Sequence, residues 1–344
     1  MSELGAGSVN LPAGIPTSHP DRERARFATD PRRFLQLALA TIWVIDGLLQ
    51  YQSYMFSKSF ATQILAPTAQ GNPGWISASI LWSAHIVEAN PIWTNAAFAT
   101  LQLFIGLAIA TRVAVKPALV VSIAWSLLVW WFGEGLGGIL LPGASALAGA
   151  PGAVLLYALL AVLLWPTKES AGDPSTGGLS TGGLFVAAKP IGVTAAKVVW
   201  FVLWGGLAAL NLEPANLTGQ SVHGVVDGMG SGQPGWLNAL ITGFTQLSAH
   251  NGVVLSVLGT VILGLIAIGV FFPPPVFRVV VIAAVVVSAF IWVIGEAFGA
   301  VFGGQGTDVN SGPLLALIAL TYWPRLGRAR TSVSAVTARE AAAA

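Results

Sequence analysis

Long runs of apolar residues alternate along this chain with short polar or glycine- and proline-rich stretches. A run of about 20 apolar residues is long enough for a helix to cross a bilayer, whose hydrocarbon layer is about 30 Å thick. The pattern therefore predicts an all-α, polytopic membrane protein. We expect about eight transmembrane helices, at residues 34–51, 92–111, 117–134, 152–165, 198–212, 253–272, 276–296 and 314–323.

One short motif, Trp-x-x-Gly-Glu-x-x-Gly, occurs twice, each time at the end of a long apolar run. Its copies are residues 130–137 and 292–299. The last run of each half is shorter than the others and is flanked by proline. These matches predict an internal duplication into two parallel four-helix repeats, residues 31–166 and 193–326. Short, glycine- and proline-interrupted segments at matching places of two halves are typical of the binding site in membrane transporters.

The composition narrows the class of protein further. Hydrophobic residues make up 55% of the chain and charged residues 9%, whereas a soluble domain carries about 25% charged residues. A net charge of +2, with basic residues that are segregated along the chain rather than clustered, argues against a nucleic-acid partner. The chain has no cysteine, which excludes an iron–sulfur cluster bound by this chain alone. No nucleotide-binding or hydrolase motif is present, so the sequence leaves open whether the protein is an enzyme.

Basic residues are segregated between the predicted loops. If the N-terminus lies in the cytoplasm, every Lys and Arg except Lys58 falls on the cytoplasmic side. The positive-inside rule then predicts a multi-pass protein of the cell (inner) membrane with both termini in the cytoplasm. Residues 1–30 and 327–344 are expected to be disordered cytoplasmic tails, and residues 167–192 a flexible linker between the repeats.

Three acidic residues form a candidate polar site, namely Glu134, Glu296 and Asp46. Acidic residues inside or beside a membrane span are costly, and they are functional candidates by default. We expect both glutamates at the C-terminal end of a helix, where the helix dipole disfavours negative charge. The structural alternative is that each glutamate accepts hydrogen bonds from loop amides. Asp46 is expected to pair with Lys58 or with a histidine of the outer loops.

His85, Glu88 and His250 are candidate metal ligands. His85 and Glu88 are three residues apart and would share one face of a helix. His85 and His250 both follow a Ser-Ala dipeptide, which places them at matching positions of the two halves. The competing interpretation is that each histidine caps its repeat at the membrane interface. A haem needs two imidazoles that face each other in the core of a helix bundle. His85 and His250 are expected in outer segments instead, which argues against haem ligation.

Each half resembles a unit of the DoxX-like membrane superfamily. The resemblance rests on four spans, a long outer segment after the first, and a Gly-x-x-x-x-Thr-Arg end to the second, here Gly106 with Thr111 and Arg112. An acidic residue is expected in the second span of many members, and this chain has Gln102 there. The whole chain also resembles multi-pass membrane proteins that share its Gly-Glu-x-x-Gly and Thr-Asp-x-Asn-Ser-Gly-Pro stretches.

The resemblance implies a membrane component of a redox or maturation system that acts at the extracytoplasmic face. Some relatives are membrane subunits of thiosulfate:quinone oxidoreductase, and others take part in the maturation of methylamine dehydrogenase. A lipid quinone is then the candidate cofactor, and a membrane or extracytoplasmic protein is the candidate partner besides the lipid bilayer. Two alternatives stay open, a transporter of a cation or small solute and a structural subunit of a membrane complex.

Overall fold

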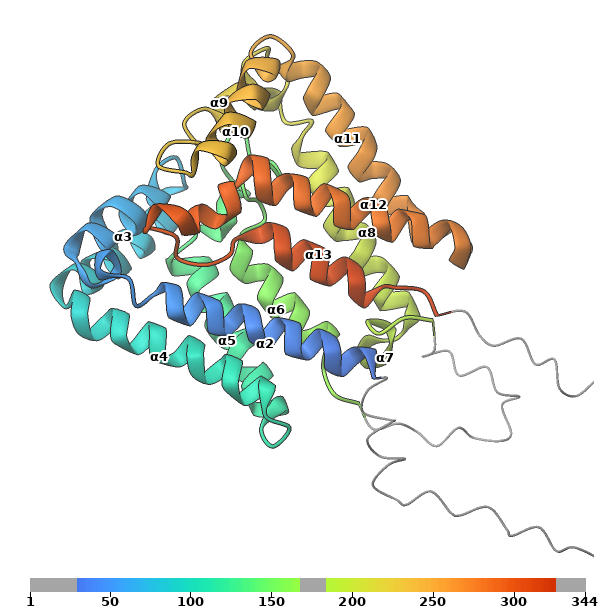
Figure 1. Cartoon of the computed structure of the whole chain (residues 1–344), viewed down its shortest axis with the longest axis horizontal. Helices are drawn as coiled ribbons and strands as arrows, with labels where there is room; N and C mark the ends of the chain where they lie inside the picture. Colours follow the sequence, from blue (N-terminus) through green and yellow to red (C-terminus); the bar gives the residue numbers. More distant parts are fainter. Residues whose placement is uncertain (1–29, 168–183, 326–344) are drawn as a thin grey trace, which may run out of the picture.

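The computed structural model describes residues 30–167 and 184–325, and both stretches are built of helices (Figure 1). The expected tails, and most of the expected linker, lie outside these residues. The α-helices are α2 (Pro31–Leu49), α3 (Gly74–Ala89), α4 (Pro91–Ala110), α5 (Val115–Phe132), α6 (Ala153–Leu163), α7 (Ala188–Ile191), α8 (Val193–Leu210), α9 (Ser221–Val226), α10 (Gly235–Ser248), α11 (Gly252–Gly269), α12 (Pro274–Phe290) and α13 (Ser311–Thr321). Shorter helical turns are η1 (Ser53–Phe56), η2 (Phe60–Leu65), η3 (Ala66–Ala69), η4 (Leu136–Gly138), η7 (Pro214–Asn216), η8 (Ile291–Gly295) and η9 (Ala297–Gly303).

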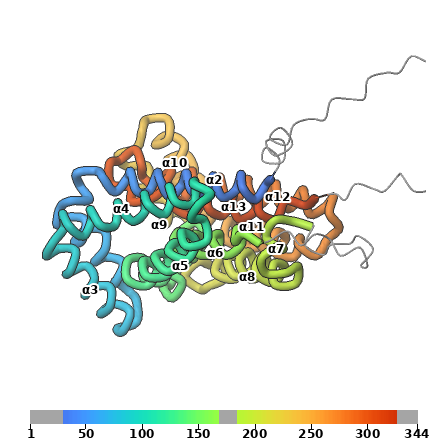
Figure 2. The backbone as a smooth tube through the Cα atoms, turned by 90° about the horizontal axis from the view of Figure 1, so that it is seen from below, coloured from blue at the N-terminus to red at the C-terminus, as the bar shows by residue number. Residues whose placement is uncertain are grey.

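Neighbouring helices pack in pairs, and one helix joins the two halves. Helix α2 lies along α4, α5 along α6, α8 along α11, and α12 along α13. Helix α13 also packs against α6 and against α2, so it contacts both halves. In Figures 1 and 2 alike, α3 lies at the opposite end of the bundle from α7. We call the end that carries α3, α9 and α10 the loop end, and the end at which α2 begins the terminal end.

Within the described residues, five helices are long and apolar enough to cross a membrane: α4, α5, α8, α11 and the continuous segment Pro274–Gly295. Helices α6 and α13 are equally apolar but have only 11 residues each. At 1.5 Å per residue such a helix is about 16 Å long, roughly half the hydrocarbon thickness. The predicted all-α class is confirmed, and the chain is compatible with an integral membrane protein. The count of eight spans and the duplication stay predictions.

Helices α6 and α13 form the centre of the core because the other helices surround them. Leu156 and Leu160 of α6 and Leu314 and Ile318 of α13 are completely buried. The longer helices instead expose apolar side chains outward, such as Phe104, which is 67% exposed. An apolar exterior around an apolar core is the arrangement expected of helices in lipid.

Close packing of α2 on α4 depends on a small residue. A Cβ atom at Gly106 would lie 2.7 Å from Val44 Cγ2 and 2.8 Å from the Ala40 carbonyl oxygen, closer than such contacts allow. The glycine therefore lets the two backbones approach, as small residues do in membrane helix pairs. This contact fixes α2, which carries Asp46, against α4.

The two copies of the repeated motif make the same local contact. Trp130 Nε1 donates a hydrogen bond to the Pro151 carbonyl oxygen, and Trp292 Nε1 donates one to the Val309 carbonyl oxygen, each over 2.8 Å. In both halves the bond ties the motif to the chain just before the last helix. The glutamate of each motif is thereby brought to the start of that helix.

Candidate functional site

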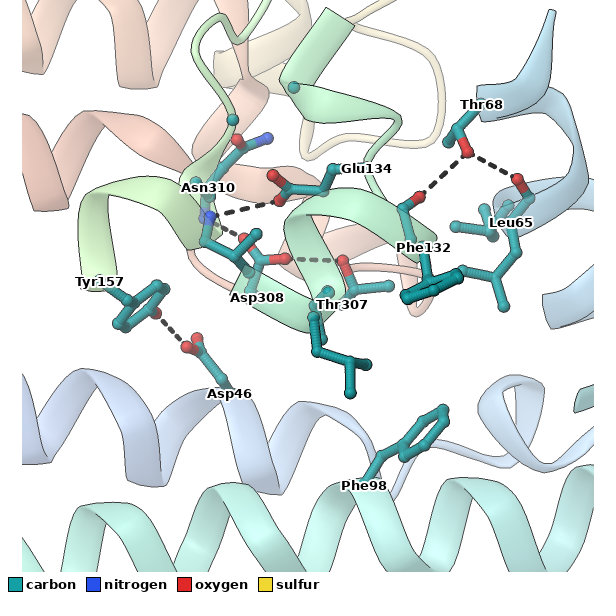
Figure 3. A pocket seen from close by; sticks show the side chains of 18 of the residues that line it. Asp46, Leu65, Thr68, Phe98, Phe132, Glu134, Tyr157, Thr307, Asp308 and Asn310 are labelled. Atoms are coloured by element: carbon teal, nitrogen blue, oxygen red, sulfur yellow. Dashed lines mark hydrogen bonds between the residues drawn. The ribbon is translucent and has the colours of Figure 1, made fainter. Parts of the chain in front are cut away.

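A cavity of about 510 Å³ lies in the first half of the chain, towards the loop end. Its size falls within the range of small-molecule sites, roughly 300–1,000 Å³. Helices α2, α3, α4, α5 and α6 contribute to its wall, together with the loop that precedes α13 (Figure 3). The polar side chains that line it are those of Asp46, Gln50, Thr68, Ser83, Gln102, Glu134, Tyr157, Thr307, Asp308 and Asn310.

The cavity wall is divided between acidic and apolar groups. Three carboxyl groups line it, those of Asp46, Glu134 and Asp308, and no Lys, Arg or His is among its lining residues. In Figure 3 these acids and Tyr157 lie on one side, whereas Leu65, Phe98 and Phe132 lie on the other. The site therefore has one wall that favours positive charge and hydrogen-bond donors, and one that favours an apolar body.

Asp46 is buried on α2 and is held by groups distant in sequence. The Tyr157 hydroxyl donates a hydrogen bond to one of its oxygens, and the Val309 amide donates to the other over 3.1 Å. The Tyr157 ring in turn stacks on Trp43, with ring centroids 4.3 Å apart. The expected partners, Lys58 or a histidine, are thus replaced by a phenol and a backbone amide.

Glu134 lies two residues beyond the end of α5, and its side chain reaches the start of α6. Its Oε1 accepts a hydrogen bond from the Val154 amide over 3.4 Å, whereas its Oε2 is shielded from solvent and has no hydrogen-bond partner. Burial, and next the Asp308 carboxylate, raise the pKa of Glu134 to about 8. A pKa of about 8 favours the protonated form of Glu134 at neutral pH.

Glu296 occupies the matching place in the second half, just beyond η8. It accepts hydrogen bonds from the Ser311 amide over 3.1 Å, from the Gly312 amide over 2.9 Å and from the Ser311 hydroxyl. Burial raises the pKa of Glu296 to about 7, against the opposing effect of these bonds. Glu296 does not line the cavity, and its bonds are those of a residue that caps α13.

Both glutamates follow the C-terminus of a helix, as expected, but a second helix also acts on each of them. Each follows the C-terminus of one helix, but its carboxylate contacts the N-terminal amides of the next helix, α6 for Glu134 and α13 for Glu296. The positive end of a helix dipole stabilises a carboxylate. The structural alternative, hydrogen bonding to backbone amides, accounts fully for Glu296 but leaves one oxygen of Glu134 unused.

Asp308 is a site residue that the sequence did not single out. It accepts hydrogen bonds from the Thr307 hydroxyl over 2.8 Å and from the Asn310 amide over 2.6 Å, and burial raises its pKa. Asp308 raises the pKa of Glu134 more than Glu296 does. The signal for it was an acceptor-rich loop, residues 303–313, in an otherwise apolar chain.

The loop that carries Asp308 comes from the second half but is fastened to the first. Gln50 Nε2 donates to the Thr307 carbonyl oxygen over 3.1 Å, and Gln52 Nε2 donates to the Gly306 carbonyl oxygen over 3.0 Å. Both glutamines follow closely on α2. The cavity is therefore complete only when both halves of the chain are present.

The candidate metal ligands are not among the lining residues of this cavity. His85 and Glu88 are on α3, and His250 follows α10; both histidines are exposed. Within residues 30–167 and 184–325, no group of three or more His, Cys, Asp and Glu side chains is placed to hold a metal ion. A metal at His85, Glu88 and His250 stays a prediction from the sequence.

Gly152, the residue before α6, allows Glu134 to approach that helix. Its φ is +95°, and a Cβ atom there would collide with Glu134 Oε2 and lie 2.8 Å from Gly137 Cα. We expect Gly152→Ala to lower the free energy of unfolding by at least about 2 kcal/mol more than Gly192→Ala. Gly192 is the matched control, since it precedes α8 with φ +83° and open space around it. Thermal unfolding of both variants in detergent is the measurement, and equal losses would contradict this role of Gly152.

No model of a known protein family, no curated protein and no solved structure matches this chain. The chemistry open to the site therefore follows from its own residues. Buried carboxyl groups without basic partners can bind a cation or hold protons. Unpaired acceptor oxygens can receive hydrogen bonds from a ligand.

Proposed function

We propose that this chain is an integral protein of the cell membrane that binds a small organic cation in its acidic cavity and exchanges it for a proton. With both termini in the cytoplasm, the loop end and its cavity face the extracytoplasmic side. The observation that carries the proposal is the cavity wall, which has three carboxyl groups and no basic side chain. A buried negative charge is stable only when a cation or a proton neutralises it.

Unused hydrogen-bond acceptors support an ammonium ion as the cationic group. Gln50 Oε1, Gln102 Oε1 and Glu134 Oε2 are all shielded from solvent and lack hydrogen-bond partners among the described residues. All three residues line the cavity. A primary ammonium group has three donors and no acceptor, which is the complement of this wall. The facing aromatic and leucine side chains would hold an apolar body attached to the ammonium group.

The raised pKa of Glu134 supports proton exchange. Near pH 7 the protonated form of Glu134 is favoured, because its pKa is about 8. A bound ammonium ion favours the ionised carboxylate and so releases that proton. Binding of the cation and loss of the proton would thus be coupled at one side chain, which is the requirement for an exchanger.

The predicted duplication would account for a cavity that is lined mainly by the first half. We propose that the matching tryptophan bonds align Pro151 with Val309, and hence Tyr157 with Leu315. Leu315 is apolar and completely buried, so the second half has no phenol at this position. In this proposal the second half has lost its own cavity. It supplies the loop that closes the cavity of the first half.

Binding of a quinol is the second candidate function. The apolar wall at Leu65, Phe98 and Phe132 would accept a substituted ring, and the unused acceptors would receive its two hydroxyl groups. The DoxX-like resemblance, which implies a role in a redox or maturation system, supports this candidate. A quinol carries no charge, however, and would leave the three carboxyl groups without a cation.

Calorimetry on the purified protein in nanodiscs tests the proposal. We expect 2-phenylethylammonium to bind near pH 7 and to release close to one proton, seen as a binding heat that differs between buffers of different ionisation enthalpy. The neutral 2-phenylethanol should bind at least tenfold more weakly. Binding of a menaquinol analogue without binding of the ammonium ion would favour the second candidate, and binding of neither would refute both. Proteoliposome uptake driven by a pH gradient then tests exchange.

A further inference from the structure

A second cavity, of about 580 Å³, lies at the terminal end of the bundle, far from the acidic one. It is formed where α2 begins, where α4 turns into α5, and where the chain leaves α6. Its charged lining residues are Asp30, Arg32, Arg33, Arg112 and Lys116. Four of these are basic and one is acidic, so the lining carries a net charge of 4 − 1 = +3. We call it the basic cavity.

We propose that the basic cavity binds a phosphate group, and that an anionic phospholipid at the cytoplasmic surface supplies it. This proposal is independent of the ligand of the acidic cavity. Basic pockets between membrane helices on the cytoplasmic side are suited to lipid head groups, because the charge and the donors meet the phosphate where it leaves the bilayer.

One arginine of the basic cavity is fixed in place before any ligand arrives. Arg33 Nη1 donates to the Ile109 carbonyl oxygen over 2.8 Å, and Nη2 donates to the Ala110 carbonyl oxygen. These carbonyls belong to the last turn of α4, whose dipole favours a cation. Arg112 follows closely and is near enough for its charge to repel that of Arg33. An anion between them would relieve this repulsion.

The start of α5 adds to the positive character of the basic cavity. Val115 and Lys116, the first two residues of α5, both line it, and no side chain caps the first amides of this helix. The N-terminus of an 18-residue helix carries partial positive charge and free amide donors. Four basic side chains and the N-terminus of α5 therefore all contribute positive potential to the basic cavity.

The surroundings of the basic cavity favour a lipid over a soluble anion. Val113, in its lining, is 96% exposed, and Phe34, on the first turn of α2, is 70% exposed. Apolar side chains beside a phosphate-binding cavity match the acyl chains that continue from a phospholipid head group. A soluble phosphate would gain nothing from them.

The test uses the full-length protein in an uncharged detergent. Phosphatidylglycerol and phosphatidylcholine are titrated separately, and bound lipid is counted by native mass spectrometry. The variant is Arg112→Gln with Lys116→Gln, both exposed residues whose loss leaves Arg33 and its bonds intact. The matched control is Lys58→Gln with Lys197→Gln, which removes the same charge outside the cavity. Each basic residue near an anionic surface strengthens binding about fivefold.

We expect phosphatidylglycerol to bind the wild type in preference to phosphatidylcholine, with about 25-fold weaker binding in the Arg112/Lys116 variant and little change in the control. A second arm measures the rise in unfolding temperature caused by inorganic phosphate. A rise in the wild type that the variant lacks, without a difference in lipid binding, would keep the phosphate site and assign it to a soluble anion. Equal behaviour of variant and wild type towards both ligands would overturn the proposal.

Discussion

Replacement of Glu134 by Gln together with Asp308 by Asn is expected to weaken ammonium binding more than 100-fold and to abolish the proton release. Glu134 and Asp308 are two of the three carboxyl groups that line the cavity. Loss of a buried charge partner costs about 2–5 kcal/mol. The variant keeps a hydrogen-bonding group at each position, so Val154 and Thr307 need not lose their partners. Calorimetry in two buffers measures both effects.

The control for this experiment is Asp227→Asn, which removes an exposed carboxylate after α9 and outside the cavity. It should leave affinity and proton release unchanged. If the double variant bound the ammonium ion within tenfold of the wild type, the carboxyl groups would have no part in binding and the proposed function would fall.

The raised pKa of Glu134 also affects the stability of the protein, and this effect can be measured without a ligand. The pKa of Glu134 is about 8 in the folded protein and 4.5 ordinarily, so between these values the folded state binds more protons. The free energy of unfolding should therefore fall as the pH rises from about 5 to about 8. Glu134→Gln alone should flatten this slope, and an unchanged slope would mean that Glu134 is not the group that titrates.

Glu296→Ala is expected to lower the free energy of unfolding by about 3 kcal/mol. The substitution leaves the Gly312 amide and the Ser311 hydroxyl buried without an acceptor, and each such group costs about 1–3 kcal/mol. The Ser311 amide keeps its other acceptor, Asn310 Oδ1. It also removes a carboxylate from the N-terminus of α13, a helix at the centre of the core. Thermal unfolding in detergent, followed by tryptophan fluorescence, is the measurement.

Glu213→Ala serves as the comparison for Glu296. Glu213 also accepts a hydrogen bond from a loop amide, that of Gly143, but it is half-buried and caps no helix of the core. Its loss should cost less than about 1 kcal/mol. If both substitutions had the same effect, Glu296 would not be the cap that stabilises α13.

The helical framework could be predicted because it depends on local pattern. Apolar runs placed the long helices within a few residues, and the short runs before Trp165 and Trp323 correspond to α6 and α13. The repeated motif also identified Glu134 and Glu296 as a pair. These features need only the order of apolar, small and acidic residues along the chain.

The partners of the acids could not be predicted, because they depend on how distant segments fold together. Asp46 meets Tyr157 across 111 residues and the Val309 amide across 263 residues. Asp308 stood in a polar loop with no helical period, and its place in the cavity follows from the glutamines that fasten that loop. The direction of Glu134 and Glu296 towards the next helix, rather than away from the previous one, is likewise decided by the turn between them.

Val309 follows Asp46 by 263 residues, so the two partners of this hydrogen bond are synthesised at different times. At about 5–20 residues per second, the ribosome reaches Val309 some 13–50 s after it has made Asp46. Throughout that interval Asp46 of the nascent first half lacks its final amide partner. A truncated product that stops before this loop never gains that partner, so the carboxyl group of Asp46 keeps one oxygen without its amide donor.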